Sequence, residues 1–134
     1  MKIINKKHSS SEIGYHFVWI TKFRHPILKN GVDITLKNIL GEVCDNYGWI
    51  IHSLEVMVDH IHLFIQTTPE DSPASIIQTL KSISAVKIFT VYPKLKSQKF
   101  WGTGLWSRGY YVGTCGNMSE DVIKKYINNQ KIKQ

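Results

Sequence analysis

Residues 49–67 read WIIHSLEVMVDHIHLFIQT, and this stretch decides the fold. β-Branched and aromatic residues are frequent in both of its halves, which predicts strands over residues 49–57 and 60–67. Only Val58 and Asp59 separate the two strands, so we expect them to form a hairpin.

Two further strands are predicted on either side of this hairpin. Residues 15–22 read YHFVWITK, a run of β-branched and aromatic residues typical of a buried strand. Residues 105–114 are expected to form a fourth strand. The intervening residues 94–104 contain three lysines and two glycines and are expected to form a loop.

Three helices are expected between and after the strands. Apolar residues recur at helical spacing from Asp33 to about Tyr47, with Asp33 as the N-cap and Gly48 as the stop. A second helix is expected to begin at Ser72-Pro73 and to end at Pro93. Ser119, followed by two acidic residues, is expected to cap a last helix that runs to the C-terminus.

The resulting order is βαββαβ followed by a further helix. This order predicts an α+β fold of the ferredoxin-like or RRM-like class, the split βαβ arrangement, in which an antiparallel sheet carries two helices on one face. The extra C-terminal helix is expected to lie across the other face or to reach a partner. No repeat or linker interrupts the pattern, so residues 1–134 are expected to form a single domain.

The composition favours a polyanionic partner. The net charge is +7 and the isoelectric point is near 9.4. Lysines and aromatic residues alternate in the second half of the chain, as in proteins that bind single-stranded nucleic acid, although the charge could also serve solubility alone. The candidate DNA-binding residues are Lys22, Arg24, Lys81, Lys87 and Arg108.

The compartment is expected to be the cytoplasm. Cys44 and Cys115 are isolated thiols without a CxxC partner, which fits a reducing environment. No apolar run approaches the roughly 20 residues of a membrane span, so we expect no membrane association.

His60 and His62 form the most informative motif of the sequence. Alternate residues of a strand share a face, so both imidazoles are expected on the side opposite Ile61 and Leu63, where they could chelate one divalent ion. An isolated pair of this kind is more often incidental. Asp59 could orient an imidazole as an outer partner of the ion, or only close the hairpin turn.

The last helix offers a second candidate feature. Tyr126 and Gln130 are four residues apart and therefore lie on one helix face. Tyr126 alone would more often pack a helix than act as a nucleophile. The amide oxygen of Gln130 could complete a His-His-Gln metal site beside the tyrosine.

Four segments together make the chain similar to a known family. They are YHFVWITKFRHPIL (residues 15–28), VMVDHIHLFIQ (residues 56–66), LWSRGYYVGTCG (residues 105–116) and YINNQ (residues 126–130). The chain resembles, over nearly its whole length, the single-tyrosine HUH transposases, called TnpA, of the insertion-sequence 200/605 family. One departure is Val58, where the family commonly has a proline; it touches no ligand.

The resemblance implies a function and a site. His60, His62 and Gln130 would be the metal ligands and Tyr126 the nucleophile, which forms a 5′-phosphotyrosine when single-stranded DNA is cleaved. Two imidazoles and an amide suit Mg²⁺ or Mn²⁺ better than Zn²⁺. The resemblance also implies a homodimer whose active sites are shared between subunits, and recognition of hairpins at the ends of a mobile element.

Other functions remain open from the sequence. A non-catalytic module that binds single-stranded DNA or RNA would also use a ferredoxin-like sheet with aromatic residues. A replication initiator or a domesticated transposase would use the same HUH chemistry on another substrate.

Overall fold

The computed structural model describes residues 12–100, 102–116 and 118–133, apart from the side chains of residues 120, 126 and 130–133. Its elements, in chain order, are β1 (Ile13–Ile20), a 3₁₀ turn (Lys22–Arg24), α1 (Val32–Tyr47), β2 (Ile50–Val56), β3 (His60–Thr67), α2 (Pro73–Val91), α3 (Pro93–Gln98), β4 (Tyr111–Cys115) and α4 (Glu120–Lys133).

The four strands form one antiparallel sheet in the order β2-β3-β1-β4. The strand β1 therefore lies in the centre, between β3 and β4, and β2 forms a hairpin with β3. This topology confirms the predicted α+β fold with its split βαβ order.

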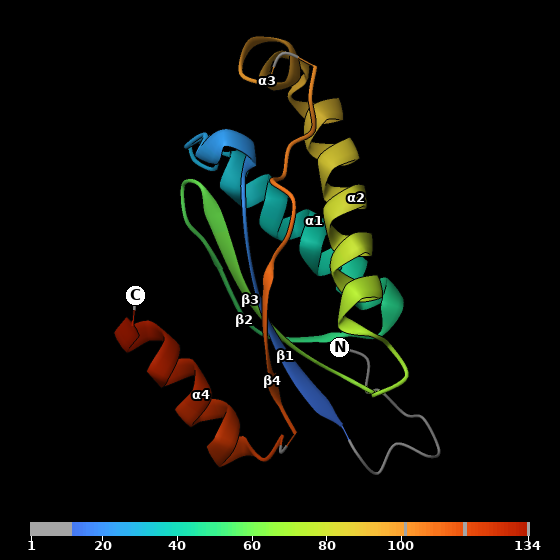
Figure 1. Ribbon diagram of the computed structural model, residues 1–134, viewed down its shortest axis with the longest axis vertical. Coiled ribbons are helices and arrows are strands. Elements are labelled where there is room, and N and C mark those ends of the chain that lie inside the picture. Colours follow the sequence, from blue (N-terminus) through green and yellow to red (C-terminus); the bar gives the residue numbers. More distant parts are fainter. Residues whose placement is uncertain (1–11, 101, 117, 134) are drawn as a thin grey trace.

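The helices α1 and α2 cover one face of the sheet (Figure 1). Alternate residues of β1 and β3, among them Phe17, Trp19 and Leu63, are almost completely buried between the sheet and these helices. Leu36 of α1 and Leu80 of α2 complete this core from the other side. Burial of these large apolar side chains is what holds the two layers together.

The helix ends follow the predicted signals with one exception. Ser72 caps α2, because its side-chain oxygen accepts a hydrogen bond from the Ser75 amide at 3.1 Å, and Gly48 ends α1 with a φ of 76°. The exception is Asp33, which was predicted as the N-cap of α1. Gly31 occupies that position, and the Asp33 carboxylate instead accepts a hydrogen bond from the Gly31 amide at 3.2 Å.

The region between α2 and β4 differs from the prediction. Part of the expected loop is the short helix α3, which begins at Pro93, a residue that suits the first turn of a helix. The fourth strand begins only at Tyr111, and Trp106 makes an isolated bridge to Thr21. The prediction of a strand from residue 105 was therefore wrong.

Side chains of α2 bind the segment before β4, which also pairs through residues 105–107 with the end of β1. The Trp106 indole packs edge-on against Trp19, and its Nε1 donates a buried hydrogen bond to Ser84 Oγ at 3.0 Å. Lys81 Nζ donates to the carbonyls of Ser107 and Gly109 at 2.8 and 3.1 Å. These backbone groups thus bond to a side chain of α2 and not to a neighbouring strand.

The helix α4 lies on the side of the sheet opposite α1 and α2 (Figure 1). It begins with the predicted cap, in which Ser119 Oγ accepts from the Val122 amide at 3.4 Å. Just before it, Met118 packs over Gly14, where a Cβ atom would come within 2.6 Å of the methionine sulfur. No helix of the described residues is long and apolar enough to cross a membrane.

We predict that Ser84→Ala lowers the free energy of unfolding by about 1–3 kcal/mol, because it leaves Trp106 Nε1 buried without an acceptor. Ser82→Ala, at a more accessible position of the same helix, is the control. Urea denaturation measures both. In a Trp106→Phe background the effect of Ser84→Ala should shrink, and equal costs for Ser84→Ala and Ser82→Ala would contradict the role of this bond.

Candidate metal and DNA site on the open face of the sheet

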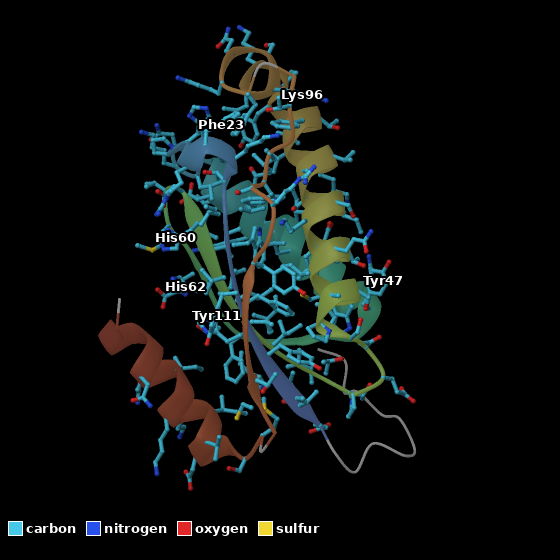
Figure 2. The ribbon with its side chains drawn as sticks, in the orientation of Figure 1. Phe23, Tyr47, His60, His62, Lys96 and Tyr111 are labelled. Atoms are coloured by element: carbon cyan, nitrogen blue, oxygen red, sulfur yellow. The ribbon has the colours of Figure 1, made fainter. Side chains whose placement is uncertain are left out.

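The strand β3 separates an apolar face from a histidine face. Ile61, Leu63 and Ile65 are completely buried against the helices. His60 and His62 alternate with them and project, half-buried, on the face that α4 overlooks (Figure 2). Their ring centroids are 5.1 Å apart. The expected placement of the two imidazoles on one face is therefore observed.

His60 is oriented by an ionised carboxylate. Its Nδ1 lies 2.7 Å from Asp59 Oδ1. The hydrogen bond from His60, followed by the charge of Arg24, lowers the pKa of Asp59 against the opposing effect of burial. An ionised carboxylate can only accept, so His60 Nδ1 is the donor, and in the neutral imidazole Nε2 carries the lone pair. Asp59 is thus placed to orient His60, while its role as the outer partner of an ion stays a prediction.

His62 contacts a histidine that the sequence pattern did not single out. His62 Nδ1 lies 3.3 Å from His16 Nε2, and the two rings are stacked with their centroids 5.5 Å apart. His16 belongs to β1 and is only 3% exposed. It alternates with the core residues Tyr15 and Phe17, and this period of two was the signal that places it on the open face.

Burial favours the neutral form of both of these imidazoles. It is the main cause that lowers the pKa of His16 to about 4, and the neighbouring His62 adds to the effect. Burial and His60 also lower the pKa of His62, against a raising contribution from Glu55. Neutral imidazoles are the form that binds a metal ion.

The residues present fit a divalent metal ion in part. In both His60 and His62 the Nδ1 atom is engaged, and within the described residues neither Nε2 has a hydrogen-bond partner. Outer partners on the second ring nitrogen are usual for histidines that bind metal. Among the described side chains, no group of three His, Cys, Asp or Glu residues surrounds a common point, so a third protein ligand has to be of another type or come from elsewhere.

The predicted nucleophile and third ligand belong to α4. Tyr126 and Gln130 lie one turn apart in this helix, but their side chains fall outside the described part of the structure. Their assembly with His60 and His62 stays a prediction. Tyr111 of β4, which is 60% exposed, lies on the same open face with its ring edge-on to His16 at 6.2 Å (Figure 2).

The candidate DNA-binding residues fall into two groups. Arg24 lies beside the histidine pair, because its guanidinium contacts Asp59 Oδ2 through Nε and Nη2, both at 3.2 Å, and Lys22 belongs to the same 3₁₀ turn as Arg24. Lys81, Lys87 and Arg108 lie on α2 and the segment that it holds, on the side of the sheet away from the histidines. The structure therefore does not bring the five residues together.

An apolar groove of about 470 Å³ runs between α2 and the segment before β4. Ile77, Lys81, Trp106 and Tyr110 are among the residues that line it. It lies on the helix side of the sheet, away from the histidine pair, so the chemistry of the open face does not use it.

Comparison with known proteins assigns the chain to a family. The family described as "Transposase IS200 like" matches residues 9–130. The ISDra2 transposase TnpA of Deinococcus radiodurans is 36% identical over 123 residues, which are 92% of this chain and 87% of that protein. The transposase of the insertion sequence element IS200 from Salmonella typhimurium is 28% identical over 128 residues, 93% of this chain and 84% of its own length.

Solved structures agree with this assignment. A crystal structure of a Deinococcus radiodurans R1 protein described as a transposase superposes with a TM-score of 0.76 at 35% identity, covering 97% of this chain and 98% of that one. A REP-associated tyrosine transposase bound to a REP hairpin shares the fold, with a TM-score of 0.59 at 18% identity over 98% of this chain and 74% of that one. Since the family match spans most of its length, this chain belongs to the IS200-like transposase family.

Proposed function

We propose that this transposase cleaves and rejoins single-stranded DNA at the open face of its sheet. The observation that carries the proposal is the histidine pair, whose two Nδ1 atoms are engaged by Asp59 and His16 so that both Nε2 atoms remain for a ligand. The helix that contains Tyr126 overlooks the same face (Figure 1).

The proposed ligands are His60, His62 and Gln130. A bound Mg²⁺ or Mn²⁺ ion would polarise the scissile phosphate and stabilise the charge that develops on it. Asp59 and Arg24 keep His60 in the tautomer that offers Nε2.

The proposed chemistry conserves the energy of the phosphodiester bond. The oxygen of Tyr126 attacks the phosphorus, the bond from phosphorus to the 3′-oxygen breaks, the phenolic proton is released to solvent, and the leaving 3′-oxygen takes up a proton from solvent. The products are a 5′-phosphotyrosine and a 3′-hydroxyl group. Attack of a 3′-hydroxyl on the phosphotyrosine restores a DNA strand and returns the phenol.

The proposed substrates are hairpins at the ends of an insertion sequence, acted on by a homodimer with shared active sites. The positive net charge and the exposed Arg24 and Lys87 support a DNA partner. The REP-associated tyrosine transposase, whose structure contains a bound REP hairpin, supports this class of substrate.

We predict that Tyr126→Phe abolishes the covalent adduct with single-stranded DNA that carries element ends in the presence of Mn²⁺. Tyr111→Phe is the matched control, since Tyr111 lies on the same face and should leave the adduct intact. A denaturing gel detects the adduct, and peptide mapping locates it. An adduct that survives Tyr126→Phe or maps to Tyr111 would overturn the assignment, and no adduct with any variant would favour a non-catalytic binding module.

Metal binding should weaken on acidification. A protonated imidazole cannot bind a metal ion, and burial lowers the pKa of His62 from its usual 6.5. We expect Mn²⁺ affinity, measured by isothermal titration calorimetry, to be constant around pH 7 and to fall only on acidification below about pH 6.5. His60→Ala and His62→Ala should each abolish binding; affinity unchanged in both would refute this site.

Lys81→Glu should weaken binding of hairpin DNA and also lower the free energy of unfolding. The second effect follows because Lys81 Nζ holds two carbonyls of the segment before β4. Lys87→Glu, at an exposed position of the same helix, should weaken binding without a change in stability. Fluorescence anisotropy at moderate salt and urea denaturation separate the two effects, and unchanged affinity of Lys81→Glu would remove Lys81 from the DNA surface.

A further inference from the structure

His16 occupies an unusual place for a polar ring. It lies in the central strand β1, between two core residues, and is 3% exposed. Its ring is stacked on His62 at an interplanar angle of 15°, and Tyr111 lies edge-on to it. The backbone of β1 is held by β3 on one side and by β4 on the other, so the position of this ring is fixed by the sheet.

The contact between the two histidines requires complementary tautomers. His62 Nδ1 and His16 Nε2 are 3.3 Å apart, so one nitrogen must donate and the other must accept. If His62 offers Nε2 to a ligand, its Nδ1 carries the proton and donates to His16 Nε2. His16 then accepts a hydrogen bond from His62 Nδ1, as Asp59 accepts one from His60 Nδ1.

We propose that His16 is a positioning residue that holds His62 in the Nδ1–H tautomer and fixes the direction of its Nε2 atom. This inference rests on the proposed metal site. Loss of such an outer partner typically weakens metal binding by about 10- to 100-fold. A histidine that only packed the sheet would show no such effect when another ring replaced it.

Two substitutions of His16 test separately the loss of its hydrogen-bond acceptor and the loss of its ring. His16→Phe keeps the stacked ring and removes the acceptor, whereas His16→Gln loses the ring but can place an amide oxygen near the position of Nε2. His52→Phe is the control, because His52 Nε2 bonds to Gln66 Oε1, on the same sheet, and not to a candidate ligand.

The first measurement is Mn²⁺ affinity by calorimetry on variants whose folding is checked by circular dichroism. We expect His16→Phe to weaken Mn²⁺ binding by about 10- to 100-fold. His16→Gln should recover most of the affinity, and His52→Phe should match the wild type. Wild-type affinity in His16→Phe, or equal losses in His16→Phe and His52→Phe, would overturn the proposal.

The second measurement needs no variant of His16 and no metal. Nitrogen-15 NMR of the labelled, metal-free protein reports which nitrogen of His62 carries the proton. The Nδ1–H tautomer is expected, and the Nε2–H tautomer would overturn the proposal even if His16→Phe did not fold. If the wild type binds no Mn²⁺, the proposed metal site fails, while the tautomer of His62 still decides the role of His16.

Discussion

The antiparallel pairing of β1 with β3 is the constraint on which the whole candidate site depends. It sets His62 opposite Val18 and His60 opposite Ile20, which places His16 diagonally beside His62. Strands alternate their side chains with a period of two, so a slip of one residue would turn His60 and His62 into the core and Ile61 and Leu63 out of it. Exposing these buried side chains to water would cost free energy, so their burial keeps the strands in register. The register in turn keeps the histidines on the open face.

Much of this arrangement could be predicted because the signals were local. The bounds of β3 agree with the prediction, since an apolar alternation over residues 60–67 begins directly after a two-residue turn. The face shared by His60 and His62 follows from the same alternation. The family, too, was recognised from short segments, and comparison confirms it.

What could not be predicted depends on contacts between distant parts of the chain. The segment 105–110 has strand-forming residues, but only residues 105–107 pair with the end of β1, and the carbonyls of Ser107 and Gly109 bond to Lys81 of α2. The contact of His16 with His62 joins residues 46 positions apart, and the apolar pattern of β1 does not indicate it. Asp33 has the chemistry of a cap, yet Gly31 has the left-handed backbone, φ 100°, at the position where α1 begins.

The connection from the sheet to α4 limits where the tyrosine helix can go. Five peptide units join Cys115, the last residue of β4, to Glu120, the first of α4, and an extended chain of that length spans at most roughly 17 Å. Met118 belongs to this connection and packs against Gly14. If a subunit received α4 from its neighbour, this connection would require the two subunits to meet near the β4 edge of the donor. The length of the connection between β4 and α4, more than the helix itself, therefore limits the geometry of any exchange of α4 between subunits.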